Sequence, residues 1–205
     1  MPNILLIGNG AREHAMAEAI SRSGYSPILF SFMKANNPGI ASLSKISKLG
    51  SYSDLSAITG FAKDNKIDFA VIGPEDPLNN GVVDALIQCG IQSVGPVKSL
   101  ARLETSKSFT RNLVNKYHIP GNPKFKVFTT PDGLETFLDQ LAGIVLKPDG
   151  LTGGKGVLVQ GDHFKSKDEA LKLCRQILKE SSSLIVEEKF DGEEFSLQCL
   201  CDGKT

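Results

Sequence analysis

Short apolar runs alternate with stretches of helical periodicity through residues 1–100. Glycine follows directly after the runs that end at Ile7, Ile72 and Val94, as is common where a buried strand meets a tight turn. Strands that alternate with helices in this way favour a parallel, doubly wound sheet. The predicted strands are residues 3–7, 28–32, 69–72 and 92–94, and the predicted helices are residues 12–22, 54–66 and 82–88.

The pattern changes in the second half of the chain. A helix is predicted for residues 103–117, and further on two strands flank the glycine-rich stretch 149–156, which indicates a hairpin instead of a strand–loop–helix unit. We therefore predict an α/β protein with a Rossmann-like parallel-sheet domain over residues 1–102 and a second α+β domain over residues 103–205. The other predicted strands are residues 125–128, 144–147, 157–160 and 184–188, and the other predicted helices are residues 131–141 and 166–180.

The last residues of the chain alternate between apolar and polar. Residues 193–201 predict one more strand, with Cys199 and Cys201 on one face as small core residues. Asp202-Gly203 is a dipeptide typical of hairpin turns, but no returning strand follows it. This predicts that the polypeptide once continued beyond Thr205.

Charge and cysteine content narrow the class of protein. Lys and Arg total 23, as do Asp and Glu, so the net charge favours neither a nucleic-acid nor a membrane partner, although a local cationic pocket stays possible. No apolar stretch approaches the ~18 residues that span a bilayer, and the N-terminal apolar run is too short for a signal peptide. The cysteines have no C-x-x-C spacing, which disfavours a metal site or disulfides. We expect a cytoplasmic protein.

The first motif, Gly8-Asn9-Gly10-Ala11-Arg12-Glu13-His14, lies between a predicted strand and a predicted helix. Glycines there let the backbone approach a ligand, and a helix N-terminus favours an anion such as phosphate. The dinucleotide fingerprint fails, because Glu13 stands at its third glycine and Met33 and Lys34 stand where an acid would bind ribose. The motif predicts a site for a phosphorylated small molecule, with a purely structural turn as the alternative.

The second motif, residues 73–78, reads Gly-Pro-Glu-Asp-Pro-Leu and follows a predicted strand at the carboxyl edge of the sheet. Ligands of open parallel sheets bind at this edge. Glu75 is either a substrate contact or a cap of the following helix, since carboxylates are favoured at helix N-termini.

The third motif runs from Lys147 to Val157 and carries four glycines between positions 150 and 156. Their backbone N–H groups can bind phosphates, and Lys147 at the strand end supplies a point charge. Gly156 follows Lys155 where a Walker loop has Ser or Thr, so this is not a Walker loop. A phosphate lid is the hypothesis, and a hairpin tip without function is the simpler alternative.

The fourth motif, residues 185–195, places acids just after an apolar strand. A solvated charge run is the ordinary explanation of such a cluster. Its position after the glycine-rich stretch favours a nucleotide pocket instead.

In this order, across nearly the whole chain, the motifs resemble the phosphoribosylamine–glycine ligases (glycinamide ribonucleotide synthetases) of the ATP-grasp superfamily. The stretch Gly-Asn-Gly-x-Arg-Glu-His is the most specific, because it separates these ligases from other ATP-grasp enzymes. The other matching segments are residues 73–78, 95–96, 103–109, 147–157 and 187–194.

The resemblance implies a step of de novo purine biosynthesis in which ATP, with Mg²⁺, joins glycine to 5-phosphoribosylamine. The second domain is then a partial ATP-grasp domain whose lid subdomain covers about residues 120–190, and the magnesium ligands lie beyond Thr205. The residues implied for nucleotide binding are Lys107, Lys147, Gly150, Gly153, Gly154, Lys155, Gly156, Glu187, Glu188, Lys189, Phe190 and Glu194. Those implied for substrate binding are Gly8, Asn9, Gly10, Arg12, Glu13 and Glu75.

The sequence also departs from the family pattern. Residues 33–40 match the usual substrate loop only loosely, Pro148 stands where alanine is more common, and Lys189 stands where a hydrophobic residue is frequent. Family members are longer, so this chain alone is expected to bind nucleotide weakly and to show no turnover. The alternatives are another ATP-grasp ligase or carboxylase of purine metabolism, a non-catalytic nucleotide-binding fragment, and a Rossmann oxidoreductase, which the broken fingerprint disfavours.

Overall fold

The computed structural model describes residues 1–150, 156–195, 197, 199 and 201. The chain forms two compact units, an N-terminal unit over Met1–Thr110 and a C-terminal unit over Arg111–Thr205. Each unit has its own sheet and its own core.

The N-terminal unit is built on a five-stranded sheet in which every neighbouring pair is parallel, in the order β3-β2-β1-β4-β5. Its strands are β1 (Asn3–Ile7), β2 (Ile28–Met33), β3 (Ile46–Leu49), β4 (Phe69–Ile72) and β5 (Gln92–Val94). Its helices are α1 (Ala11–Ser21), α2 (Pro38–Leu43), α3 (Leu55–Asp64), α4 (Glu75–Asn80), α5 (Val82–Gln88) and α6 (Lys98–Thr105).

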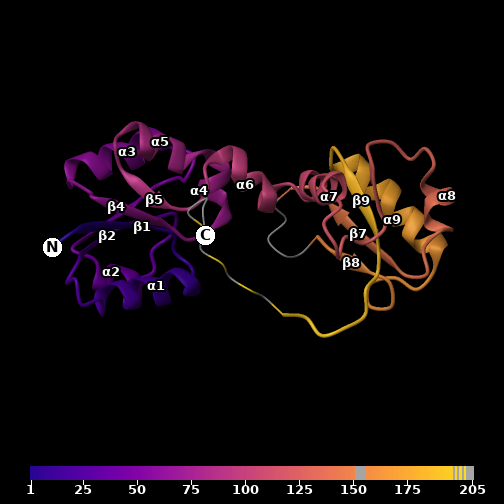
Figure 1. Cartoon of the computed structure of the whole chain (residues 1–205), viewed down its shortest axis with the longest axis horizontal. Helices are drawn as coiled ribbons and strands as arrows, with labels where there is room; N and C mark the ends of the chain where they lie inside the picture. Colours follow the sequence, from indigo (N-terminus) through magenta and orange to yellow (C-terminus); the bar gives the residue numbers. More distant parts are fainter. Residues whose placement is uncertain (151–155, 196, 198, 200, 202–205) are drawn as a thin grey trace. The chain divides into compact units, whose positions relative to one another are not determined.

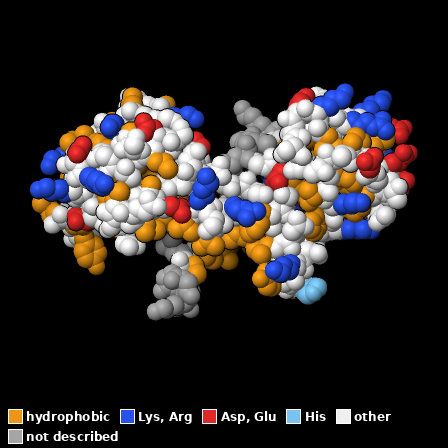
Figure 2. Space-filling model, turned by 90° about the horizontal axis from the view of Figure 1, so that it is seen from above, with side chains coloured by type: hydrophobic (Ala, Val, Ile, Leu, Met, Phe, Trp, Pro, Cys, Tyr) orange, Lys and Arg blue, Asp and Glu red, His pale blue; other side chains and the backbone are white. Residues whose placement is uncertain are grey.

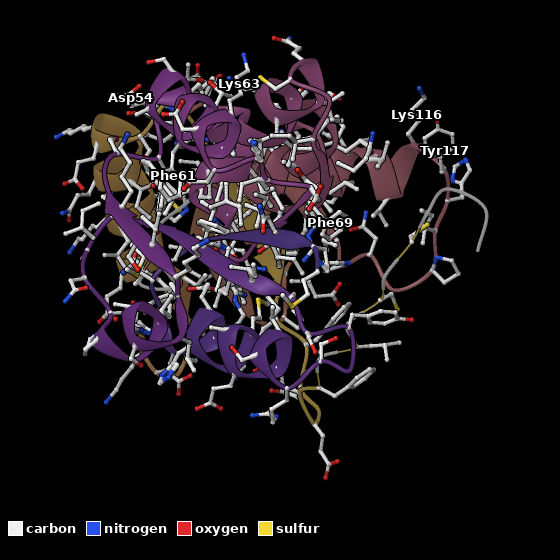
Figure 3. All side chains as sticks on the ribbon, turned by 90° about the vertical axis from the view of Figure 1, so that its left-hand side faces the viewer. Asp54, Phe61, Lys63, Phe69, Lys116 and Tyr117 are labelled. Atoms are coloured by element: carbon white, nitrogen blue, oxygen red, sulfur yellow. The ribbon has the colours of Figure 1, made fainter. Side chains whose placement is uncertain are left out.

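Helices cover both faces of this sheet, as Figure 1 shows, with α1 and α2 on one face and α3 and α5 on the other. Leu5 and Ile7 of β1 pack toward α3 and α5, while Leu6 between them packs toward α1 and α2. Because successive side chains of a strand point to opposite faces, a strand covered on both sides is apolar throughout. In Figure 3, Phe61 lies between α3 and the sheet, and its ring centroid is 6.2 Å from that of Phe32.

The C-terminal unit has a four-stranded antiparallel sheet in the order β6-β9-β7-β8. The strands are β6 (Phe125–Phe128), β7 (Ile144–Pro148), β8 (Leu158–Val159) and β9 (Leu184–Glu188), and the helices are α8 (Leu134–Leu138) and α9 (Lys167–Glu180). Helix α7 (Lys107–Lys116) spans the boundary between the two units. Ile144, Leu146 and Val186 form one core with residues of α8 and α9, so the alternate residues of β7 and β9 occupy the opposite face.

The predicted fold class is confirmed, and the glycine-rich stretch does connect two antiparallel strands. Several predicted elements are wrong in extent. The single helix predicted for residues 103–117 is two helices, because Ser106 adopts an extended conformation (φ −132°, ψ 105°) between α6 and α7. The helix predicted for residues 131–141 is the single turn α8, which begins after Gly133 in a left-handed conformation. The short helices α2 and α4 and the strand β3 were not predicted, and β3 is exposed along its whole length.

The strand predicted for residues 193–201 is also wrong where it can be checked. Residues 193–195, 197, 199 and 201 are not in a strand, and Phe195 and Leu197 are exposed. Cys199 and Cys201 are exposed as well, not core residues. A strand requires a hydrogen-bonded neighbour, and none of the described strands pairs with this segment. Asp202 and Gly203 lie outside the described residues.

Charges of both signs occur over the visible faces of the molecule, as Figure 2 shows. Within the described residues, no helix is long and apolar enough to cross a membrane. The cytoplasmic location and the lack of a nucleic-acid partner stay predictions.

Candidate functional site

The sheet of the N-terminal unit reverses its strand order between its central strand β1 and the neighbouring strand β4. Helix α1 follows β1 on one face, and α4 and α5 follow β4 on the other (Figure 1). Ligands of open α/β sheets bind at the carboxyl ends of the strands at such a switch point. Gly8 and Gly73 come directly after these strands, so the first two sequence motifs meet there.

Glu13 is buried at this switch point, with 4% of its surface exposed. Its Oε2 accepts a hydrogen bond from the backbone N–H of Gly10 at 2.7 Å, which satisfies one of the unpaired donors at the start of α1. A Cβ on Gly8 would overlap Glu13 Cγ, and so would a Cβ on Gly73. The glycines therefore leave room for a buried carboxylate, and the side chain of Glu13 supports the loop from inside.

Arg12 connects the two loops of the switch point. Its Nη2 donates to the carbonyl oxygen of Gly73 at 2.9 Å and to Glu75 Oε1 at 3.3 Å, and its Nε donates to Glu13 Oε1 at 3.1 Å. Glu75 is the first residue of α4, so its carboxylate lies in the first turn of that helix, where a negative charge is favoured, and it also contacts Arg12. About half of the Arg12 side chain (55%) is exposed, so it can also reach a bound anion.

A chain of hydrogen bonds fixes the Asn9 carboxamide. The buried Tyr52 hydroxyl accepts from the backbone N–H of Lys34 at 3.2 Å and donates to Asn9 Oδ1 at 2.6 Å. Asn37 Nδ2 donates to the Asn9 carbonyl oxygen at 3.1 Å, while Asn37 Oδ1 caps α2. Tyr52 donates to Asn9 Oδ1, and no described residue accepts from Asn9 Nδ2, so the two Nδ2 protons can serve as donors at the switch point.

Tyr52→Phe is expected to cost about 1–2 kcal/mol of unfolding free energy, because it leaves the Lys34 N–H and Asn9 Oδ1 without their partner. The measurement is urea-induced unfolding. Tyr25→Phe is the matched control, since that side chain is 84% exposed and should change nothing measurable. Equal stability of the two variants would show that the Tyr52 hydroxyl is not needed to fix the loop.

The C-terminal unit brings three charged groups together on the sheet face opposite α8 and α9. Glu187 of β9 is 2% exposed. Its Oε1 accepts from Arg111 Nε of α7 at 2.6 Å, and its Oε2 accepts from Lys147 Nζ of β7 at 2.6 Å and from Arg111 Nη2 at 3.1 Å. We call Arg111, Lys147 and Glu187 the charge triad. It carries two cations for one carboxylate, which leaves an excess positive charge.

The charge triad determines how the Glu187 carboxyl titrates. Burial acts to raise the pKa of Glu187, but the hydrogen bonds and charges of Arg111 and Lys147 outweigh it, and the pKa lies below its ordinary value. A carboxyl whose pKa is lowered by folding stabilises the fold above its unfolded pKa of about 4.3, and this contribution is lost as the pH falls through the folded pKa.

We therefore expect the unfolding free energy of the C-terminal unit to decline below about pH 4.3. Glu187→Gln should remove part of that decline, because glutamine does not titrate. The measurement is urea unfolding at a series of pH values from neutral to acid. An identical pH dependence in the variant would mean that other carboxyls cause the acid instability.

The other residues predicted for nucleotide binding are more dispersed. Glu188 Oε2 accepts from the backbone N–H of Lys124 at 3.1 Å, and the backbone N–H of Lys189 donates to the Gly143 carbonyl at 3.0 Å. Phe190 and Glu194 are exposed. Lys107 is the first residue of α7, Gly150 has a φ of +90°, and Gly156 is partly buried, whereas Gly153, Gly154 and Lys155 lie outside the described residues.

An open depression of about 600 Å³ lies beyond one end of the C-terminal sheet, next to the segment that follows β9. Lys165, Lys189, Gln160 and Asp191 line it together with backbone of Gly143. No group of three or more His, Cys, Asp or Glu side chains suited to a metal ion occurs within the part of the chain that the structure describes.

Three residues that shape these sites were not predicted from the sequence, namely Tyr52, Asn37 and Arg111. Asn37-Pro38 carries a recognisable signal, because Asn before Pro is typical of a helix N-cap followed by proline at the first helical position. Arg111 lies 36 residues before Lys147 and 76 before Glu187, and only the fold brings the three together.

The fold defines the class of protein. It is similar to an ADP complex of N5-carboxyaminoimidazole ribonucleotide synthetase (TM-score 0.74, 20% identity, 92% of this chain and 47% of that chain). It is also similar to phosphoribosylamine–glycine ligase from Thermotoga maritima (TM-score 0.69, 26% identity, 93% of this chain and 44% of that chain). The chain thus shares with both structures a fold in which a parallel-sheet unit is followed by an antiparallel α+β unit, and residues 105–205 match a family model of an ATP-grasp domain.

Sequence comparison gives the family. Residues 2–104 match the N domain of phosphoribosylglycinamide synthetase, and residues 105–205 match its ATP-grasp (A) domain. The chain belongs to the phosphoribosylglycinamide synthetase family. It is 44% identical to the phosphoribosylamine–glycine ligase of Methanopyrus kandleri (100% of this chain, 47% of the relative) and 47% identical to that of Methanocaldococcus jannaschii (98% and 47%). The chain therefore spans about half the length of these relatives.

Proposed function

We propose that this chain supplies the substrate-binding unit and the ATP lid of a phosphoribosylamine–glycine ligase. The observation that carries the proposal is the charge triad, which places Lys147 and an excess positive charge at the end of β7, directly before the glycine-rich stretch. The family assignment over the whole chain supports the same function.

In the proposed reaction, a carboxylate oxygen of glycine attacks the γ-phosphorus of ATP, forming glycyl phosphate and releasing ADP. The amine of 5-phosphoribosylamine then attacks the glycyl carbonyl carbon, phosphate leaves, and the amine proton passes to a base or to solvent. Mg²⁺, when bound, would neutralise phosphate oxygens. Lys147 would hold phosphate oxygens of ATP as a point charge, and such catalysis depends mainly on positioning and on charge stabilisation.

The switch point of the N-terminal unit would hold 5-phosphoribosylamine. The start of α1 offers backbone N–H groups that have no partner inside the helix, a favourable place for the 5-phosphate. Asn9 Nδ2 and the exposed part of Arg12 are further donors there. Glu13 would act indirectly by fixing Gly10, and Glu75 by fixing Arg12.

The test is ADP formation by the protein expressed from its complete reading frame, with ATP, Mg²⁺ and freshly prepared 5-phosphoribosylamine, with and without glycine. Glycine-dependent ADP release together with glycinamide ribonucleotide as product supports the proposal. Lys147→Met should lower kcat/KM for ATP at least about tenfold, the equivalent of 1.4 kcal/mol. ADP release that depends on bicarbonate and not on glycine would instead assign the protein to an ATP-grasp carboxylase.

A further inference from the structure

The two cations of the charge triad bind the Glu187 carboxylate in different ways. Arg111 donates to both oxygens of Glu187, through Nε to Oε1 at 2.6 Å and through Nη2 to Oε2 at 3.1 Å. Lys147 donates to Oε2 alone, at 2.6 Å. A bidentate guanidinium–carboxylate pair is fixed in geometry, whereas a lysine ammonium is a point charge on a flexible stem.

Arg111 also forms hydrogen bonds with a second residue, Asn122. Its Nη1 donates to Asn122 Oδ1 at 3.3 Å, and Asn122 Nδ2 donates back to the Arg111 carbonyl oxygen at 3.3 Å. Lys147 Nζ has no second hydrogen-bond or ion-pair partner among the described residues. Of the two cations, Lys147 is therefore the one whose side chain can leave Glu187 without breaking another polar contact with a described residue.

The burial of Glu187 makes this difference matter, because only 3% of its side chain is exposed. A buried carboxylate that loses its sole partner becomes an uncompensated charge, which is strongly unfavourable. With Arg111 present, Lys147 can turn away and leave a neutral Arg111–Glu187 pair behind. Without Arg111, the same movement would leave Glu187 unpaired.

We propose that Arg111 is a positioning residue that neutralises Glu187, so that Lys147 can exchange this carboxylate for a phosphate oxygen of ATP. The exchange with phosphate depends on the proposed function, whereas the neutralisation of Glu187 by Arg111 does not. Lys147 forms the contact with the nucleotide, and Arg111 acts through Glu187 without touching it. The exchange moves no proton and breaks no covalent bond.

The first experiment tests neutralisation without any ligand, on the 205-residue chain. In Lys147→Met, the ¹³C chemical shift of the Glu187 carboxyl carbon at pH 7 should stay that of a carboxylate, and the chain should stay folded, because Arg111 remains. A protonated Glu187 or an unfolded C-terminal unit in this variant would overturn the proposal, since it would show that Arg111 alone does not keep Glu187 neutralised.

The second experiment tests the exchange in the protein expressed from its complete reading frame, by calorimetric titration with MgATP without glycine. Arg111→Met should weaken ATP binding at least about tenfold, because Lys147 is then needed by Glu187. Arg111→Lys should recover most of the affinity, since it restores the charge. Unchanged ATP affinity in Arg111→Met would overturn the proposal, as would a loss in Arg111→Lys as large as in Arg111→Met.

Two controls separate this proposal from a structural effect and from the proposed function. Arg175→Met removes an exposed arginine of α9 and should leave ATP affinity unchanged. Hydrogen exchange of β7 and β9 amides shows whether Arg111→Met still folds, and if it does not, Arg111→Lys and Lys147→Met decide the outcome. If the unaltered protein binds no ATP, the exchange with phosphate is overturned together with the proposed function, while the first experiment still decides the neutralisation.

Discussion

Glu187→Ala is expected to lower the unfolding free energy of the C-terminal unit by about 3 kcal/mol. The substitution leaves Arg111 and Lys147, whose side chains are only 26% and 21% exposed, without the carboxylate that pairs them. Two like charges then face one another across a space that the alanine does not fill. Removing one member of a buried ionic group is costly chiefly because the remaining charges stay desolvated.

The measurement is urea unfolding followed through the exchange of backbone amides in β7 and β9, so that the C-terminal unit is observed by itself. Glu135→Ala is the matched control, because this glutamate of α8 is exposed and its loss should change stability by about 0.5 kcal/mol at most. If Glu187→Ala is no more destabilising than Glu135→Ala, the charge triad contributes nothing to stability, and Glu187 does not need Arg111 to neutralise it.

Periodicity predicted the interior strands β1, β4 and β9 well because their surroundings leave few alternatives. Their runs are apolar enough to be buried, and their observed bounds equal the predicted ones. Elements that depend on context were predicted less well. Nothing in Ser106 itself requires a break between α6 and α7, and the four exposed residues of β3 carry no apolar pattern.

In the candidate site too, the sequence predicted single residues better than the contacts between them. The sequence predicts Lys147 as a phosphate contact and Glu187 as part of an acidic cluster, but it does not predict that they form an ion pair at 2.6 Å. That pair follows from the antiparallel register, in which Val145 lies opposite Glu187 and Lys147 lies opposite Ile185. Lys147 and Glu187 are therefore diagonal neighbours on the same face of the sheet. Local patterns thus locate candidate residues, while their partners depend on contacts between distant segments.

Glu13 is a motif residue that stabilises the loop after β1 from a buried position. The sequence shows only that it replaces the third glycine of a dinucleotide fingerprint, whereas the structure shows its carboxylate buried beneath the loop. The same replacement explains why glycines are needed on both sides of it, since Gly8 and Gly73 each leave space for its side chain. The first two motifs are therefore coupled through one side chain.

Gly8→Ala adds one methyl group to the N-terminal unit and is expected to lower the unfolding free energy of that unit by at least about 3 kcal/mol. Gly8 has a φ of +140°, a region that residues with a Cβ rarely adopt. The added Cβ would also overlap Glu13 Cγ and lie 2.9 Å from Pro74 Cδ, where the proline ring leaves little freedom to move. Backbone strain and steric overlap would therefore both destabilise the Gly8→Ala variant.

The matched control is Gly60→Ala within α3, which adds the same methyl group to the same unit. Apart from its chain neighbours and the backbone of α3 itself, no atom lies within 4 Å of the added Cβ, and an alanine in a helix interior should raise stability by about 0.5–1 kcal/mol. The measurement is urea unfolding of both variants, followed through amides of β1 and β4. It should show a lower unfolding free energy for Gly8→Ala and a higher one for Gly60→Ala. A small effect of Gly8→Ala beside the expected gain from Gly60→Ala would mean that Glu13 can leave its buried position at little cost, and that the loop after β1 does not need this carboxylate to keep its shape.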